Sequence, residues 1–382
     1  MAKKGQVNYI KKRIMKILLD FLTIRYISNS GIVVYVSRVL DGWYASGVKD
    51  VTIMTSQYWA DMCKNRWPEY NIIVVDVPQT GYTRKGLKVG RSRIKAINAS
   101  GCDIVFYPMP EPWFFHKPHI PQVTVIHDML APKIAKGKHW WYHHTLLPWQ
   151  IKRSEKVLAI SQYTKQEALD IYKFLSPQNV SVVYNPLKWD DTKYLPFIKG
   201  SYILCVNTIS PYKNGLTLAK AFARIKDKTD CKLVYVGIIW GDYWAQIEQV
   251  AKENGFSDRL LHLENLQNEE LVALYQHAKL FVSPSTMEGF GQTPIEAAIY
   301  GCPVITSRET ALPETTLGLV NYYDPVMSDE ALAKQMQQVL FNPPTEEKTS
   351  LISERLKVAY DTESQAKKIY DVLLEVTLNH KS

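Results

Sequence analysis

Two glutamates, with seven residues between them and two glycines just after the first, are the residues best placed in this sequence to do chemistry. Glu288 is followed by Gly289 and Gly291, and Glu296 lies further along the same segment. A carboxylate can accept hydrogen bonds from two neighbouring hydroxyls at once. One of the two glutamates would therefore suit the hydroxyls of a ribose, and the other those of a sugar ring.

The residues around this pair predict a strand, an open loop and then a helix. Residues 278–282 form a short apolar run typical of a buried parallel strand, and serine, proline and glycine break regular structure over 283–291. Apolar residues return at helical spacing from Ile295 and stop at Gly301, a residue suited to a left-handed helix cap. A helix that begins under an open loop presents free N–H groups, which favour phosphate.

A purely structural explanation of Glu296 stays open at this point. Thr293 and Glu296 have the spacing of a capping box, and Pro294 suits the first helical position. A cap explains neither Glu288 nor the two glycines that follow it.

The motif EGFG, followed by EA and then by GCPVI, resembles the retaining glycosyltransferases of family four. The resemblance extends from Met15 to about Leu374. It implies an α/β protein with the GT-B fold, in which two Rossmann-like, doubly wound domains face a cleft. The implied domains are residues 1–190 for the acceptor and 191–358 for the nucleotide sugar, with a C-terminal helix at about 360–378 packing back onto the first.

Site residues follow from the same resemblance. It implies that Glu288 and His127, the latter within TVIHD, act on the donor sugar, that Glu296 binds the ribose and that Lys213 binds the diphosphate. The full set expected to bind the donor is Gly31, Lys213, Leu266, Gly289, Phe290, Gly291, Gln292 and Glu296.

The segment around Lys213 departs from the family pattern in two places. Thr208 stands where the family has an arginine, and Tyr212 where the most similar subgroup has a basic residue. That subgroup uses GDP-mannose or dTDP-rhamnose, so GDP- and dTDP-sugars are favoured as donors and UDP-sugars remain compatible. Diphosphate binding would then depend on Lys213, on loop amides and on a helix dipole.

Charge is distributed unevenly along the 382 residues, a length that suits two domains. Residues 1–190 hold 27 Lys and Arg against 13 Asp and Glu, whereas the remainder is acidic by five. A basic half suggests an anionic partner, such as a lipid pyrophosphate or an anionic membrane. Arg84, Lys85 and Arg91 are candidate acceptor-side residues, although the same segment also fits an ordinary polar helix face.

The cysteines and histidines do not point to a cofactor. Five cysteines without metal-ligand spacing favour reduced thiols and a cytoplasmic setting, with membrane association on the cytoplasmic face as a further option. The run from His139 to His144 lies in a predicted amphipathic helix, where its aromatics between lysines suit a membrane or acceptor face better than a metal. We expect neither a metal nor a cofactor.

We therefore expect a retaining, metal-independent glycosyltransferase. It would move a hexose or deoxyhexose, with mannose or rhamnose favoured, from a nucleotide sugar to a glycan or a lipid-linked acceptor in polysaccharide or O-antigen-type synthesis. An epimerase and a non-catalytic nucleotide-sugar-binding protein are the alternatives. A dinucleotide oxidoreductase is disfavoured because the third glycine of its motif is missing, and the basic half matches no nucleic-acid-binding module, so we expect no nucleic acid partner.

Overall fold

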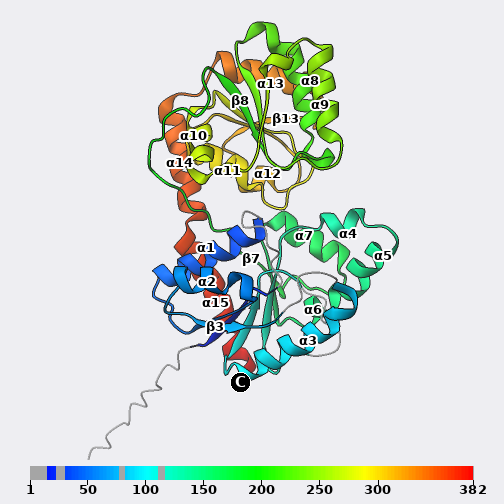
Figure 1. Cartoon of the computed structure of the whole chain (residues 1–382), viewed down its shortest axis with the longest axis vertical. Coiled ribbons are helices and arrows are strands. Elements are labelled where there is room, and N and C mark those ends of the chain that lie inside the picture. Colours follow the sequence, from blue (N-terminus) through cyan, green and yellow to red (C-terminus); the bar gives the residue numbers. More distant parts are fainter. Residues whose placement is uncertain (1–14, 23–30, 77–81, 111–116, 382) are drawn as a thin grey trace, which may run out of the picture. The chain divides into compact units, whose positions relative to one another are not determined.

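The computed structural model describes residues 15–22, 31–76, 82–110 and 117–381, without the side chains of 82–89 and 381. The described chain forms two parallel β-sheets with helices between their strands (Figure 1). Alternation of strand and helix is the pattern that folds into parallel sheets, because each crossover needs a helix to cover a sheet face. The predicted fold class, two Rossmann-like α/β domains, is confirmed.

The first sheet has the strand order β3-β2-β1-β4-β5-β6-β7. Its strands are β1 (Ile17–Asp20), β2 (Val51–Thr55), β3 (Asn71–Val74), β4 (Ile104–Tyr107), β5 (Gln122–Ile126), β6 (Lys156–Ala159) and β7 (Val180–Val182). Central strands such as β1, β2 and β4 are buried at every residue, as expected of strands covered on both faces. Order reverses between β1 and β4, where the chain moves from one half of the sheet to the other.

Helices join these strands. They are α1 (Gly31–Ala45), α2 (Gln57–Arg66), α3 (Tyr82–Ala99), α4 (Leu130–Ile134), α5 (Gly137–Trp141), the π-helical turn η1 (Tyr142–Leu146), α6 (Pro148–Arg153) and α7 (Gln162–Ile171). The aromatic-rich segment 57–70 had no clear prediction from the sequence. It forms α2, whose buried face consists of Trp59, Ala60 and Cys63.

The second sheet has the order β10-β9-β8-β11-β12-β13. Its strands are β8 (Tyr202–Val206), β9 (Lys232–Val236), β10 (Leu260–Leu263), β11 (Leu280–Ser283), β12 (Val304–Ser307) and β13 (Asn321–Tyr323). The helices that alternate with these strands are α8 (Gly215–Ile225), α9 (Tyr243–Glu253), α10 (Asn268–His277), α11 (Gln292–Ile299), α12 (Leu312–Thr315) and α13 (Asp329–Phe341), followed by α14 (Glu346–Tyr360) and α15 (Thr362–Lys381).

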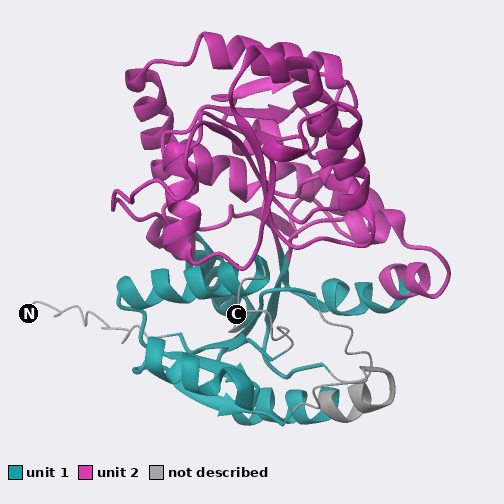
Figure 2. Ribbon diagram, turned by 45° about the horizontal axis from the view of Figure 1, so that its top comes forward, with its two compact units in different colours: residues 1–125, 145–157, 367–382 teal, residues 126–144, 158–366 magenta. Residues whose placement is uncertain are grey.

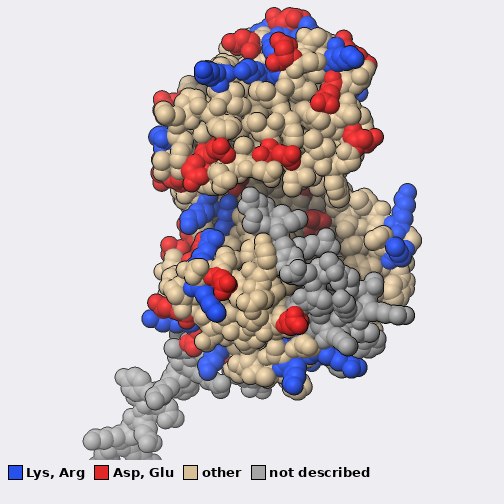
Figure 3. Space-filling model, in the orientation of Figure 1, with Lys and Arg blue, Asp and Glu red and all other residues tan. Residues whose placement is uncertain are grey.

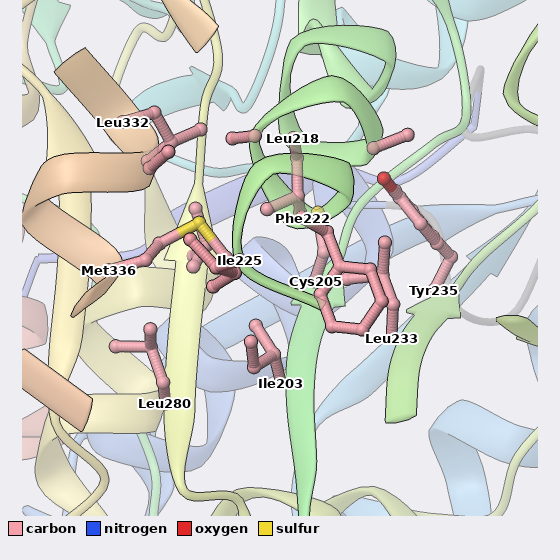
Figure 4. Packing of buried hydrophobic residues seen from close by; sticks show 14 of the residues in the cluster. Ile203, Cys205, Leu218, Phe222, Ile225, Leu233, Tyr235, Leu280, Leu332 and Met336 are labelled. Atoms are coloured by element: carbon pink, nitrogen blue, oxygen red, sulfur yellow. The ribbon is translucent and has the colours of Figure 1, made fainter. Parts of the chain in front are cut away.

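A continuous apolar core holds α8, α9 and α13 on the second sheet. Leu218, Phe222 and Ile225 of α8 meet Ile203 and Cys205 of β8 (Figure 4). Leu233 and Tyr235 of β9, Leu280 of β11, and Leu332 and Met336 of α13 complete the part of the cluster that is labelled there. This burial fixes where β8 and β11 end and therefore where the loops that follow them begin.

Contacts divide the chain into two compact units (Figure 2). Unit 1 is residues 1–125, 145–157 and 367–382, and unit 2 is residues 126–144 and 158–366. Unit 2 thus includes part of the first sheet as well as the whole of the second. The predicted domain boundary at residue 190 stays a prediction.

All five cysteines are free and buried. Burial raises the pKa of the Cys63 thiol to about 12. It also raises the pKa of the Cys205 thiol to about 12, although Asn207 donates a hydrogen bond to the Cys205 sulfur. Both thiols therefore stay protonated at neutral pH and serve as small core side chains.

Candidate functional site

The strand order of the second sheet locates the candidate site. The chain runs from β8 through β9 to β10 on one side and then returns to β11 on the other side of β8. In open α/β sheets, ligands bind beyond the carboxyl ends of the strands where the order reverses. The loops that leave β8 and β11, residues 207–214 and 284–291, lie at that position and contain half of the predicted donor-binding residues, with Gln292 and Glu296 following in α11.

A mostly buried ion pair joins the two loops. Lys213 lies at the end of the 3-10 helix η2 (Pro211–Lys213), and its Nζ is 2.7 Å from Oε1 of Glu288. The two side chains are only 15% and 14% exposed. Burial acts to lower the pKa of Lys213, but the charge and hydrogen bond of Glu288, helped by Tyr212 and Asp128, raise it above its ordinary value. Lys213 is therefore a charged ammonium at neutral pH.

The β8 loop is held in place by the backbone of its neighbours. Asn214 adopts the left-handed conformation with φ of 57° and caps α8, and its side-chain amide donates to the carbonyls of Pro284 and Val326 at 3.1 and 2.9 Å. The N–H and the hydroxyl of Thr286 both donate to the carbonyl of Tyr212 at 2.9 Å. Lys213 and Glu288 thus belong to two loops whose relative position is fixed by hydrogen bonds.

Helix α11 begins earlier than the sequence predicted, and the structural explanation of Glu296 is wrong. The helix starts at Gln292, and its N-cap is Gly291 with φ of 75°, where a Cβ would come within 2.5 Å of Leu312. Glu296 therefore occupies the interior of the helix and does not pair with Thr293 in a capping box. Its Oε1 accepts from the amide of Gln292 at 2.6 Å and its Oε2 from the hydroxyl of Tyr275 at 3.4 Å. Gly301 has φ of 83° after the helix, as predicted.

Gly289 is the point of closest approach to His127. A Cβ on Gly289 would lie 2.1 Å from the carbonyl oxygen of His127 and 3.0 Å from Cβ of Asp128, so only glycine fits. His127 follows β5 and is half-buried, and Asp128 accepts from the N–H of Leu130 at 2.9 Å. The structure thus brings the backbone of His127 to the loop that carries Glu288, and both belong to unit 2.

The other predicted donor-side residues lie at the same edge of the sheet or close to it. Leu266 follows β10 and is half-buried. The ring of Phe290 is buried and packs edge-on against Tyr360 at 5.2 Å, so this residue contributes structure to the loop. Thr208 is exposed, and the ring of Tyr212 lies 5.1 Å from the Lys213 ammonium.

Fewer of the predicted residues of the first sheet are brought together. Gly31 begins α1 and is exposed, and a Cβ placed on it would have no atom of the described chain within 4 Å. Arg84 and Lys85 lie in α3, but their side chains are outside the described residues, and Arg91 is exposed on the same helix. Arg93 is not a surface cation of this basic segment as its sequence context suggested: it is buried and forms an ion pair with Asp20.

The histidine run does not form a metal site in the structure. His144 stacks on Trp140 at 4.4 Å, with its Nδ1 3.0 Å from the Trp140 carbonyl, and burial lowers the pKa of His143. Within the described ranges, no three His, Cys, Asp or Glu side chains group as metal ligands would. In the same ranges, no helix has both the length and the apolar character required to cross a bilayer.

Several residues that hold the site escaped the sequence analysis. Thr310, with φ of 55°, accepts the N–H of Glu288 at 2.9 Å, and Ser161 and Thr164 donate to the Gly289 carbonyl at 2.7 and 3.2 Å. Glu314 accepts from the N–H groups of Gln162 and Tyr163. They lie in the segments VLAISQYTK and RETALPE, which resemble the family's sequence, but their residue types alone assigned them no role at the site.

Two family models match the chain. The model described as "Glycosyltransferase Family 4" matches residues 29–188, and the one described as "Glycosyl transferases group 1" matches residues 190–355. The candidate site loops lie in the second match, and His127 lies in the first.

Similarity to curated proteins extends over part of each chain. The chain is 30% identical over 188 residues to the O-antigen chain mannosyltransferase RfbU of Salmonella typhimurium, covering 48% of this chain and 51% of that one. It is 29% identical over 215 residues to the serotype-specific mannosyltransferase WbdA of Escherichia coli, covering 50% and 26%. The chain thus spans about half the length of RfbU and less of WbdA.

Solved structures match over nearly the whole chain at low identity, which shows the fold. Anabaena HepE in complex with UDP and glucose matches with a TM-score of 0.73 at 15% identity, covering 94% of this chain and 100% of that one. WaaG, a glycosyltransferase involved in lipopolysaccharide biosynthesis, matches with a TM-score of 0.66 at 15% identity, covering 94% and 99%. With two consecutive family models over most of its length and this fold, the chain belongs to the family four, group 1 glycosyltransferases with the GT-B fold.

Proposed function

We propose that this chain is a retaining glycosyltransferase that moves a hexose or deoxyhexose, with mannose or rhamnose favoured, from a nucleotide sugar to a glycan or lipid-linked acceptor. The observation that carries the proposal is the mostly buried Lys213–Glu288 pair at the strand-order reversal, on the loop that leads into α11. A fixed cation, a carboxylate and free helix amides are what a sugar joined to a diphosphate requires.

The leaving diphosphate gains negative charge as its bond to the sugar breaks. Lys213, which is charged and mostly buried, would stabilise that charge together with the amides at the start of α11. Gly291 as N-cap brings no side-chain acceptor to those amides. Because these groups can take up the charge themselves, we propose that the transfer needs no metal.

The two carboxylates have separate roles in the proposal. Glu288 would accept hydrogen bonds from the hydroxyls of the sugar. Glu296, held by Gln292 and Tyr275, would accept hydrogen bonds from the hydroxyls of the ribose. Gly289 lets the backbone of the loop approach His127, whose ring would face the sugar. Leu266 would lie at the nucleobase, and Gly31 at the start of α1 remains a proposed donor-binding residue.

Retention of configuration in a single step requires the acceptor to attack on the face that the diphosphate leaves, and we propose this route. In the proposed step the bond from the anomeric carbon to the phosphate oxygen breaks, and a bond from that carbon to the acceptor oxygen forms. The acceptor proton passes to the departing phosphate oxygen, which is the adjacent base. No side-chain nucleophile is needed in this step.

We propose GDP- or dTDP-sugars as the favoured donors, with UDP-sugars also compatible. RfbU and WbdA are named as mannosyltransferases, which supports mannose, whereas HepE was solved with UDP and glucose. The acceptor would belong to a surface polysaccharide of the O-antigen type. Arg84, Lys85 and Arg91 remain the proposed acceptor-side residues.

We propose that the enzyme acts in the cytoplasm, at an anionic membrane surface. Ile134, Trp140 and Trp141 are 63%, 50% and 52% exposed, and Lys136 and Lys138 between them are also exposed. Exposed tryptophans next to lysines are typical of segments that lie in a lipid headgroup layer. On the face drawn in Figure 3, described Lys and Arg side chains are spread among acidic ones, so this segment supports the proposal better than overall charge does.

Thermal denaturation with GDP, UDP, dTDP and ADP tests the donor site, and release of nucleotide from the matching sugar nucleotides tests catalysis. We expect one nucleotide to raise Tm in the wild type, and Lys213→Ala to abolish both effects. If no nucleotide binds, the proposal fails. If a sugar nucleotide binds and yields a free epimer without any acceptor, the epimerase alternative replaces it, and if one binds without any turnover, the binding-protein alternative does.

Sedimentation with vesicles tests the membrane contact separately. We expect the wild type to bind vesicles in which phosphatidylglycerol supplies the negative charge, and the double variant Trp140→Ser, Trp141→Ser to bind several-fold less. Equal binding by the two proteins would remove this segment from the proposal and leave the donor site untouched.

A further inference from the structure

Gly289 is fixed from three sides by residues of unit 2. The backbone of His127 lies against its α-carbon, where a Cβ would come within 2.1 Å of the His127 carbonyl oxygen. Its own carbonyl accepts from Ser161 Oγ at 2.7 Å and from Thr164 Oγ1 at 3.2 Å. One residue earlier, the N–H of Glu288 donates to Thr310 Oγ1 at 2.9 Å.

Ser161 and Thr164 come from the start of α7. Ser161 is the N-cap of that helix, and its Oγ accepts from the N–H of Thr164 at 3.0 Å. A serine hydroxyl has one proton, and here the geometry directs it to the Gly289 carbonyl while its lone pairs serve the cap. The same side chain therefore begins the helix and holds the loop that carries Glu288.

Glu314 also fixes the start of α7. Its two carboxylate oxygens accept from the N–H groups of Gln162 and Tyr163 at 2.7 and 3.0 Å. A carboxylate on the first-turn amides is favoured by the helix dipole as well as by the hydrogen bonds. Burial, followed by the charge and hydrogen bond of Glu314, raises the pKa of Tyr184 to about 12, so this neighbouring hydroxyl keeps its proton.

The helix that carries Glu314 also binds the loop that contains Gly289. It belongs to α12, whose Thr315 donates through Oγ1 to the carbonyl of Phe290 at 2.5 Å. Consecutive carbonyls of the loop, Gly289 and Phe290, are thus held by α7 and by α12, and Glu314 joins these two helices. Glu288 lies directly before the pair of anchored carbonyls.

We propose that Ser161, Thr164 and Glu314, the α7 cap cluster, are positioning residues for the transfer reaction. They hold the backbone of Gly289 against His127 and so fix Glu288 and its partner Lys213 relative to His127. They touch no donor atom in this proposal, which rests on the proposed function above. A displacement of about 1 Å at a reacting centre can lower a rate about 100-fold, so anchoring of this kind affects turnover more than affinity.

Turnover and binding of the nucleotide, measured separately, test the proposal. The test variants are the double variant Ser161→Ala, Thr164→Val and the single variant Glu314→Gln. Ser328→Ala is the matched control, because Ser328 caps α13 by accepting from the N–H of Ala331 at 3.0 Å and, in the described part of the chain, its hydrogen bonds stay within residues 325–332. Both serine changes remove a helix cap, so both should lower Tm by a similar few degrees.

We expect the double variant to lose at least about tenfold in turnover of the nucleotide sugar that the wild type accepts, as a partial misplacement of the reacting groups requires. Its Kd for the matching nucleoside diphosphate should stay close to that of the wild type, because Lys213 and Glu296 are intact. The turnover of Glu314→Gln should lie between that of the double variant and that of the wild type, and Ser328→Ala should keep wild-type turnover. Turnover of the double variant equal to that of Ser328→Ala would overturn the positioning role.

A wild type that turns over no sugar nucleotide would count against the proposed function, and amide hydrogen exchange then decides on the cluster. Faster exchange at Gly289 and Phe290 in the double variant than in Ser328→Ala would show that the cluster fixes this loop. Equal exchange would overturn the proposal without any reference to catalysis.

Discussion

Glu288→Gln gives the sharpest test of the donor site, because it should improve one function while destroying another. Glu288 neutralises Lys213 at 2.7 Å in the structure, and the two side chains are 15% and 14% exposed. A diphosphate that approaches Lys213 gains its attraction but meets the repulsion of the carboxylate. Glutamine keeps the size of the side chain and removes its charge.

The magnitude follows from the geometry. A phosphate oxygen bonded to Lys213 on the side away from Glu288 would lie about 5 Å from the carboxylate, and two unit charges at that distance repel by about 3 kcal/mol at an effective dielectric constant of about 20. Relaxation and screening reduce this value, so we expect nucleoside diphosphate to bind about 10- to 100-fold more tightly to Glu288→Gln than to the wild type.

Turnover should move in the opposite direction. An amide replaces the carboxylate that accepts from sugar hydroxyls in the proposed reaction, and charge-assisted hydrogen bonds are about twice as strong as neutral ones. We expect the variant to bind GDP, or whichever nucleotide the wild type binds, more tightly in calorimetry and to transfer sugar about 100-fold more slowly, the scale of losing one group that acts in the transition state. The loss of a partner leaves Lys213 charged and mostly buried, so Tm should fall, and calorimetry belongs well below it.

Asp329→Asn supplies the control, since Asp329 pairs with Arg224 in the same unit through a more exposed contact at 2.5 Å. It should change neither affinity nor turnover. Nucleotide affinity of Glu288→Gln that is equal to or weaker than that of the wild type would refute the reasoning. Glu288 would then hold Lys213 in its binding position, and its charge would not compete with the ligand.

Three further changes test other parts of the site. Glu296→Gln should weaken nucleotide binding about tenfold in calorimetry with little change in Tm. Glu253→Gln, which breaks an equivalent pair with Gln249, should leave nucleotide binding unchanged. Equal affinities of the two variants would remove the ribose role from Glu296. Gly289→Ala should abolish turnover because its Cβ would overlap the backbone of His127. Gly255→Ala, at a glycine with φ of 69° and open space around it, should only lower Tm. An active Gly289→Ala enzyme would show that the close approach of Gly289 to His127 is dispensable. The pKa of Lys213 is raised in the folded protein, so its pairing with Glu288 stabilises the fold fully below pH 10.5, the ordinary pKa of lysine. That stabilisation is lost only as the pH rises through the higher pKa of the folded state. Lys213 should therefore cause no fall in nucleotide affinity, measured by calorimetry, between about pH 7 and 9.

The sequence predicted the strand before the candidate loop well because local signals agreed there. The run at 278–282 was predicted as a buried strand and overlaps β11 (Leu280–Ser283), since an apolar run followed by serine, proline and glycine points to one structure. The start of α11 was predicted too late along the chain. Thr293 and Pro294 imitate a helix start, but the left-handed Gly291 caps the helix directly before Gln292.

The contacts that fix the site could not be read from the sequence, because they join distant segments. Asn214 bonds to Pro284 and Val326, and Ser161 bonds to Gly289 across 128 positions. A buried arginine such as Arg93 has the same sequence appearance as an exposed one until Asp20 is found beside it. Residue type indicates which chemistry is available, whereas the partner of each residue depends on the tertiary fold.

The missing basic residues leave this loop with a single cation for a diphosphate. Thr208 is exposed and Tyr212 contributes its ring beside Lys213, so the loop offers one mostly buried cation where the family pattern has more positive charge. That single ammonium is already compensated by Glu288, and the charge of Asp128 also acts on it. In the proposed reaction, diphosphate affinity would therefore come from the exchange of one anion for another on Lys213, with the amides of α11 as the remaining favourable interaction. An enzyme built this way would release its nucleotide product readily and would depend on contacts with the sugar, which engage Glu288, to hold the intact donor.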